Sequence, residues 1–166
     1  MATNYLLKFN GGQIEGESKV QGYEDWILLE SYNWGATQTG TFSYNQGGGG
    51  GKVSMHDFNF RMKTNKASPK LMEACANALH INSVRFVALK PGGPGKLVES
   101  TTVTLNNVIV SSYTTGIQTG NDDISSCQIG LNFSMVHFTH TPQTDQGSSG
   151  KTVDGTWDLR KQKSGQ

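Results

Sequence analysis

Two glycine-rich segments end in a lysine, as phosphate-binding loops do. Such a loop needs the spacing G-x-x-x-x-G-K-[ST], so that backbone amides and the lysine hold phosphates where a helix begins. Residues 46–53 read QGGGGGKV, with Gln46 replacing the first glycine and Val53 replacing the magnesium-binding hydroxyl. Residues 145–152, DQGSSGKT, have Asp145 at the first position. Both segments lead into strand-like sequence, so we expect no nucleotide site.

The histidines and cysteines form no metal-binding or nucleophilic pattern. His137 and His140 are three residues apart in a predicted strand, so their side chains point to opposite faces. Cys75 on a predicted helix and Cys127 on a predicted strand both lie among apolar residues, as buried thiols do. The sequence contains no Cys-x-x-Cys, His-Glu-x-x-His or Gly-x-Ser-x-Gly spacing. We therefore expect no catalytic residue, no metal and no cofactor, and a protein that is not an enzyme.

Tryptophans and paired carboxylates leave a carbohydrate hypothesis open. Trp26, Trp34 and Trp157 could stack on sugar rings, although in a β-rich chain such residues more often belong to the core. Paired carboxylates could cleave glycosides, but loop carboxylates are more simply solvated charges. A carbohydrate-binding β-domain is therefore the alternative function. The carboxylate pairs are Glu15 with Glu17 and Glu24 with Asp25.

Length and composition indicate one β-rich domain. The 166 residues favour a single domain over 1–166, with residues 160–166 as a flexible tail. Glycine, at 21 residues, is about twice its usual share, which indicates turns and strands. The net charge of +1 lacks the basic excess of a nucleic-acid-binding protein. No apolar stretch approaches the roughly 20 residues of a membrane span, and no signal peptide begins the sequence. We expect no nucleic-acid binding and no membrane insertion.

The hydrophobic pattern predicts a mainly β fold with one helix. Residues 68–80 form the helix, with Ser68 as its cap, Pro69 in the first turn and an apolar stripe at 3–4-residue spacing. An open sheet of this size would leave exposed edges, so we expect a closed barrel or a sandwich of two packed antiparallel sheets, with long Gly-rich loops. The predicted strands are 4–10, 26–34, 36–43, 52–62, 83–90, 96–113, 126–140 and 152–159.

The sequence patterns of two of these strands predict local distortions. The alternation of residues 96–113 loses its phase at Asn106-Asn107, which indicates a bulge or a strand covered on both faces. Residues 126–140 alternate cleanly, with an apolar face and an uncharged polar face. That strand is longer than strands usually are, so we expect it to bend or to pass from one sheet to another.

Five consecutive glycines, Gly47–Gly51, precede Lys52. They could form a phosphate-binding loop, a linker between domains or a long loop within one domain. A phosphate-binding loop is excluded because Gln46 and Val53 depart from the required pattern. A linker is excluded because the segments on both sides belong to one predicted domain. We therefore expect a mobile loop that becomes ordered only against a neighbouring molecule, because glycine loses the most backbone entropy on ordering.

A series of segments runs along nearly the whole chain and begins with Gly16-Glu17-Ser18 and the aromatic-x-Trp-Gly ending of residues 32–35. In this order the segments resemble the Hcp family, the haemolysin-coregulated tube proteins of bacterial type VI secretion. Many relatives carry a histidine in the loop before the second strand, where Gly22-Tyr23 stand here. The other similar segments are the Gly-rich loop with residues 51–60, then residues 66–75, 105–116 and 131–143, and Trp157.

The resemblance implies a closed β-barrel of two packed antiparallel sheets with a flanking helix. It also implies a structural subunit that closes into hexameric rings, which stack into a tube inside a contractile sheath. Its implied partners are its own copies, a VgrG-type spike, sheath and baseplate proteins, and effector toxins in the lumen. Assembly in the bacterial cytoplasm would be followed by secretion through the type VI apparatus. Ser31 and Asn33 are the candidate lumen residues, although they could be simply exposed strand residues. The candidate contact loop between subunits or rings is Gly47, Gly48, Gly49, Gly50, Gly51 and Lys52.

Overall fold

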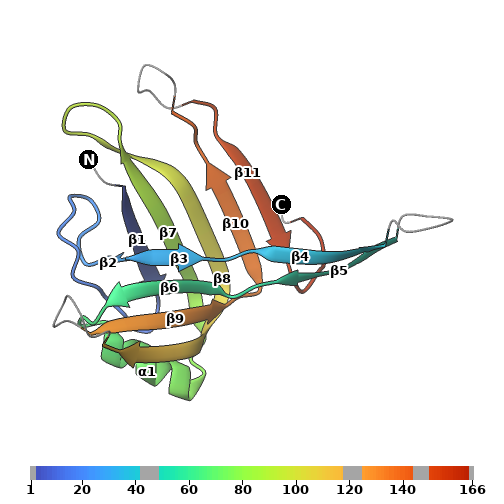
Figure 1. Cartoon of the computed structure of the whole chain (residues 1–166), viewed down its shortest axis with the longest axis horizontal. Helices are drawn as coiled ribbons and strands as arrows, with labels where there is room; N and C mark the ends of the chain where they lie inside the picture. Colours follow the sequence, from blue (N-terminus) through green and yellow to red (C-terminus); the bar gives the residue numbers. More distant parts are fainter. Residues whose placement is uncertain (1–2, 42–48, 118–124, 144–149, 165–166) are drawn as a thin grey trace.

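The computed structural model describes residues 3–41, 49–117, 125–143 and 150–164, and is a β structure with one helix in these ranges (Figure 1). The mainly β prediction is therefore confirmed. The elements are β1 (Asn4–Asn10), β2 (Ile27–Leu28), β3 (Ser31–Asn33), β4 (Ala36–Thr41), β5 (Gly49–Met55), β6 (Phe58–Lys63), α1 (Ser68–Asn77), β7 (Ile81–Pro91), β8 (Leu97–Gly116), β9 (Ser126–Asn132), β10 (Met135–His140) and β11 (Val153–Asp158).

Strand β8 belongs to two sets of strands that cross each other. Its first part pairs with β7 on one side and β10 on the other, and its last part pairs with β9. The order is β2-β1-β7-β8-β9-β6-β3, with β10 and β11 attached beside β8 and all pairs antiparallel. Strands β1, β7, β10 and β11 run across the direction of β3, β6 and β9 (Figure 1). The pairings form an open path from β2 to β3, so by themselves they do not establish the predicted closed barrel.

The chain bends where the sequence pattern lost its phase. Asn107 has a φ of 52°, in the left-handed region that asparagine tolerates better than most residues. The predicted strand 126–140 divides at the same level, because Phe133 and Ser134 separate β9 from β10. The Ser134 amide donates to the Asn106 carbonyl at 3.1 Å, and the Asn107 side chain donates to the Ser134 hydroxyl at 3.0 Å. Both predicted distortions therefore form one hydrogen-bonded corner.

Residues 16–26 form a loop over the outer face of β1 and β7. Trp26 of this loop is buried with Leu6 and Val87. The Tyr23 hydroxyl donates to the Glu99 carboxylate at 2.6 Å, and Arg85 pairs with the same carboxylate at 2.8 Å. Burial, together with the Glu99 contact, raises the pKa of Tyr23 to about 12. Sheet side chains thus hold this loop in place.

The helix begins at the predicted residue but is shorter and is capped differently. Ala67 is the N-cap and makes no side-chain cap bond, whereas Ser68 is the first helical residue. Its hydroxyl accepts from the Asn65 amide at 3.1 Å, so the predicted serine cap is wrong. The helix ends at Asn77, before residue 80, because Ala78 turns into the left-handed region with φ 49°. Leu71 and Ala74 are its buried apolar residues.

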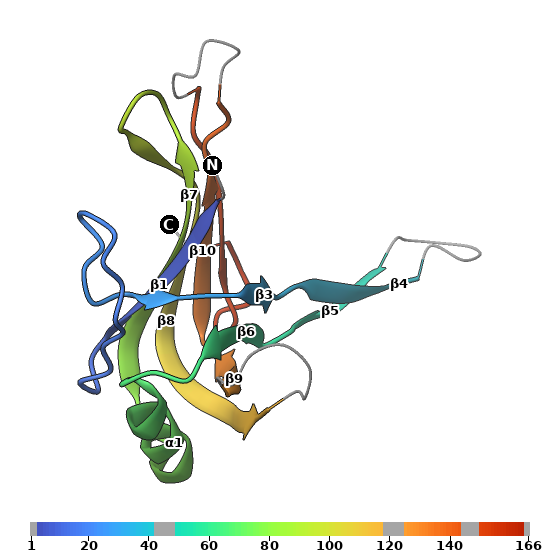
Figure 2. The same ribbon diagram turned by 60° about the vertical axis from the view of Figure 1, so that its left-hand side comes forward.

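Strands β4 and β5 form a separate two-stranded ribbon. Its base is held where the His56 amide donates to the Gly35 carbonyl at 2.8 Å. From there it extends away from the other sheets (Figure 2). The predicted glycine loop is corrected in part, because Gly49–Gly51 are strand residues and Gly49 and Gly50 face Thr41 and Gly40. Gly47 and Gly48 lie outside the described residues.

Replacing Gly16 with alanine should destabilise the protein. A Cβ at Gly16 would lie 2.6 Å from the Trp26 carbonyl carbon and 2.7 Å from the Ile27 Cα, and backbone atoms cannot yield as a side chain can. We expect Gly16→Ala to lower the free energy of unfolding by about 2 kcal/mol, measured by urea denaturation. Gly155→Ala is the control, because nothing lies within 4 Å of its Cβ position. Equal stability of the two variants would contradict this packing.

Candidate functional site

One face of the sheet formed by β3, β6, β9 and the end of β8 is polar and mostly uncharged. The register aligns side chains from four strands into two rows across this face. The first row is Ser31, Arg61, Gln128 and Thr114, and the second is Asn33, Asn59, Gly130 and Ser112. Arg61 is the one charged residue among these eight. We call these eight residues the polar face.

The core determines which side chains the polar face presents. Alternate residues of a strand point to opposite sides, and those on the other side of β6 are Phe58, Phe60 and Met62, each at most 1% exposed. Ile129 and Leu131 of β9 are likewise fully buried. A shift in register by one residue would expose these apolar side chains and bury the polar ones, so burial fixes the face.

Asp57 holds the strands together at one end of the polar face. Its carboxylate accepts from the Ser111 hydroxyl at 2.6 Å and from the side-chain amide of Asn132 at 2.9 Å. The side-chain amide of Asn59 donates to the backbone carbonyl of Asp57 at 3.1 Å and to the side-chain oxygen of Asn33 at 3.4 Å. These contacts join β3, β6, β8 and β9 through side chains as well as through the backbone.

Gly130 gives the second row its close packing. A Cβ at Gly130 would collide with the Ser112 hydroxyl and would lie 3.0 Å from the Asn59 side-chain oxygen. The neighbouring polar groups therefore occupy the space that another residue would need. The result is a surface of short polar side chains without a projecting group at this position.

The buried thiol beneath this sheet is enclosed by hydroxyl groups. Cys127 is fully buried, with Thr64 Oγ1 at 3.4 Å and Ser68 Oγ at 3.5 Å from its sulfur. Burial alone raises the pKa of this thiol, but its hydrogen bonds with Ser68, Thr64, Tyr113 and Thr115 outweigh burial and lower the pKa. No reagent can approach the sulfur without opening the core, so its surroundings are those of a packed residue.

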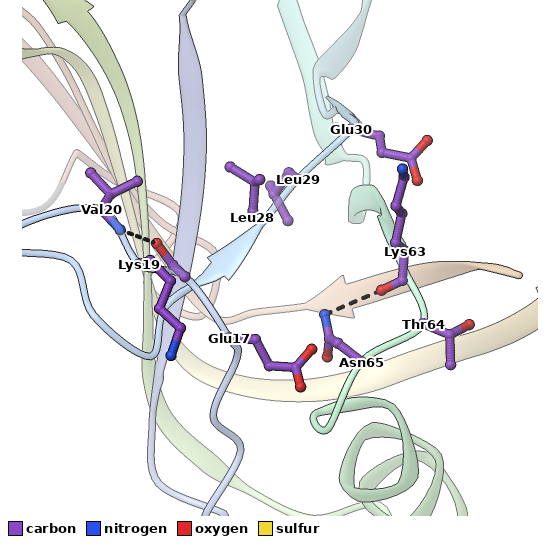
Figure 3. A pocket seen from close by; sticks show the side chains of 10 residues that line it. Glu17, Lys19, Val20, Leu28, Leu29, Glu30, Lys63, Thr64 and Asn65 are labelled. Carbon is purple, nitrogen blue, oxygen red and sulfur yellow. Dashed lines mark hydrogen bonds between the residues drawn. The ribbon is translucent and has the colours of Figure 1, made fainter. Parts of the chain in front are cut away.

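A cavity of about 670 Å³ lies between the loop 16–26 and the segment that links β2 to β3 (Figure 3). Val20, Leu28 and Leu29 line its apolar part. Its charged residues are of both signs, and the Lys63 side chain extends toward Glu30 (Figure 3). The balance gives the cavity no preference for a ligand of one charge. The charged lining residues are Glu17, Lys19, Glu30 and Lys63.

The described residues offer no arrangement for metal or sugar chemistry. Within the described ranges no three His, Cys, Asp or Glu residues gather in a group that could hold a metal ion. Trp26 belongs to the cluster on the outer face, whereas Trp34 and Trp157 pack against the main core. The three tryptophans therefore do not form the single platform that sugar stacking would need. The helix of the described chain is too short and too polar to cross a membrane.

The structure brings together the two predicted lumen residues and adds others. Ser31 and Asn33 are both exposed on the polar face, at the strand positions that the alternation predicted. The sequence analysis missed Asn59, Arg61 and Thr114, which reach this face from distant segments. The uncharged polar alternation of residues 126–132 was the signal that could have identified the rest of the surface.

Removing the Asp57 carboxylate should loosen the polar face. Asp57→Ala leaves the Ser111 hydroxyl and the Asn132 amide without their acceptor, and we expect a loss of about 1 kcal/mol of stability at this exposed site. Chemical denaturation measures the loss. Ser31→Ala is the control on the same face, and we expect it to change stability by less than about 0.5 kcal/mol. A loss in Ser31→Ala as large as in Asp57→Ala would contradict the role of Asp57.

Comparison with known proteins identifies the family. Residues 6–140 match the model of the family described as "Type VI secretion system effector, Hcp". Protein hcp1 of Pseudomonas aeruginosa is 33% identical over 161 residues, which cover 96% of this chain and 97% of that protein. A structure of a type six secretion system protein superposes with a TM-score of 0.90 at 24% identity, covering 99% of this chain and 100% of the other. Hcp1 from Salmonella typhimurium gives a TM-score of 0.76 at 25% identity, covering 99% of both chains. The chain belongs to the Hcp family of the type VI secretion system.

Proposed function

We propose that this protein is a structural subunit of the inner tube of a type VI secretion system, and not an enzyme. Its copies close into hexameric rings, and the rings stack into a tube that carries effector proteins. The observation that supports this proposal is the polar face, a sheet surface of mostly short polar side chains. The core lies behind it, and the chain belongs to this family. A ring requires a heterologous interface whose rotation closes on itself.

The polar face is the proposed lining of the lumen. A channel that carries folded cargo must be wetted and must not bind that cargo too tightly. Ser31 and Asn33, which are exposed there, supply short polar groups without charge. We infer that these two residues contact the carried proteins, together with Asn59 and Gln128 of the same face.

The ribbon of β4 and β5 is the proposed contact between subunits or rings. Among the described elements its two strands contact mainly each other, although an extended ribbon orders its backbone at a cost in entropy. A neighbouring subunit would compensate for that cost. Gly49–Gly51 and the exposed Lys52 belong to the described part of the ribbon, and Gly47 and Gly48 are included in the proposal by sequence.

We further propose that residues 27–33 close the two sets of strands into a barrel. The Leu29 amide donates to the Tyr5 carbonyl of β1 at 2.8 Å. The next amide, that of Glu30, donates to the Arg61 carbonyl of β6, also at 2.8 Å. One continuous segment, which contains β2 and β3 at the two ends of the strand order, thus bonds to both β1 and β6, which supports closure.

The remaining proposed partners follow from a role in secretion. They are the VgrG-type spike, the contractile sheath and baseplate, and effector toxins held in the lumen. We propose that the subunit assembles in the bacterial cytoplasm without a signal peptide, and that sheath contraction expels it with the tube into the surroundings or a target cell.

Purified protein should form six-membered annuli. Negative-stain electron microscopy of the full chain, with sedimentation velocity over a range of concentrations, measures this directly. The expected result is a single ring species with six subunits around an open centre. A protein that stays monomeric at every concentration would contradict the tube proposal.

Reversing the charge of Lys52 should affect assembly without affecting the fold. Lys52 is exposed on the ribbon, so we expect Lys52→Glu to melt within about 2 °C of the unmodified protein. Its contact with a neighbouring subunit should weaken, which microscopy would detect as fewer stacked rings or fewer closed rings. Lys90→Glu, at an exposed position on β7, is the charge-matched control. Equal assembly by both variants would exclude Lys52 from the contact.

A further inference from the structure

A small hollow opens beside the polar face, where β6, the end of β8 and the start of β9 meet. Its volume is about 190 Å³, below the roughly 300–1,000 Å³ of sites for small-molecule ligands. It is therefore the size of a single side chain. Arg61, Thr114 and Gln128, which share one row of the polar face, line it together with Ser126 and Ile117.

The guanidinium of Arg61 is unpaired in the part of the chain that the structure describes. Within residues 3–41, 49–117, 125–143 and 150–164, the side chain of Arg61 makes no ion pair and no hydrogen bond. It is nevertheless only partly exposed, because the neighbouring strands flank it. Arg85, in contrast, pairs with Glu99 at 2.8 Å. A partly covered guanidinium that bonds to none of the described side chains can pair with a carboxylate of another molecule.

Two carboxylates of the described residues around this sheet already have partners. Asp57 accepts from Ser111 and Asn132, at 2.6 and 2.9 Å. Glu30 accepts from the Ser126 hydroxyl at 3.3 Å, and the Lys63 side chain extends toward it (Figure 3). Among the described residues that line the hollow none is acidic, and Arg61 is the charged one.

The other lining groups suit a carboxylate as well. Gln128 and Thr114 lie next to Arg61 in register, and neither side chain bonds to another described residue. An amide and a hydroxyl can each donate to an oxygen. Ile117, which is 62% exposed, offers an apolar contact at the edge. One cation, two neutral donors and an apolar edge match the side chain of aspartate or glutamate within a peptide.

We propose that this hollow binds a carboxylate from an acidic segment of the carried protein, with Arg61 as the residue that selects it. This proposal rests on the assignment of the polar face to the lumen. Arg61 would form two parallel hydrogen bonds with the carboxylate, and Gln128 and Thr114 would donate to the remaining lone pairs. A hexameric ring would present six such sites, so a weak interaction at each would still retain cargo with several acidic side chains.

The test uses the full chain and two labelled peptides of equal length, one alternating aspartate with glycine and the other alternating lysine with glycine. Fluorescence anisotropy at low salt should show binding of the aspartate peptide and none of the lysine peptide. R61Q should lower the affinity for the aspartate peptide by about tenfold, and R61E should abolish its binding. Raising the salt concentration to about 1 M should also lower the affinity of the unmodified protein for this peptide, because the ion pair is partly exposed.

K90Q is the matched control, since it removes one exposed positive charge from β7, outside the polar face. An equal loss of affinity in K90Q and R61Q would overturn the proposal in favour of attraction by net charge. Equal binding of the two peptides to the unmodified protein would also overturn it, without the need for a variant. Electron microscopy of the same samples measures ring formation independently of peptide binding. Intact rings without selective peptide binding would therefore reject this site and leave the tube proposal in place.

Discussion

The structure depends on one strand that serves two sets of partners. Between Thr101 and Asn106, β8 is paired on one side with β7 and on the other with β10, and beyond the corner at Asn107 it is paired with β9. Each of these ladders leaves its backbone groups bonded, as burial requires. Because the strand turns at this corner, one side of the β3–β6–β9 sheet faces the core and the other faces solvent. The polar face exists because of that turn.

The electrostatics of the molecule follow the same division. On the outer face, charges are paired: Arg85 meets Glu99, whose carboxylate also accepts from Tyr23, and Arg85 and Lys8 lie near the ring of Trp26. These contacts hold the loop 16–26. On the polar face, neutral amides and hydroxyls predominate, and Arg61 lacks a partner in the part of the chain that the structure describes. The contrast separates a surface that stabilises the fold from one that is available to other molecules.

Local patterns predicted the elements, whereas the site required their pairing. The apolar spacing from Leu71 to Leu79 and the position of Pro69 identified the helix, because these signals lie within a few residues of each other. For the same reason the blurred phase at Asn106-Asn107 marked the corner. Arg61 and Thr114 were missed because their neighbours in the row come from segments far away in the sequence. The strand at Gly49–Gly51 was missed for another reason: glycine has a weak strand preference, and pairing with β4 overrides it.

The shared strand also has a mechanical meaning. The hydrogen bonds of an antiparallel ladder lie perpendicular to the strand, so a pull along β8 loads many of them together in shear. A strand at the edge of a sheet, peeled from one end, would lose its bonds one after another under far less force. The fold thereby places a strand that is bonded on both sides where it connects the polar face to the rest of the subunit.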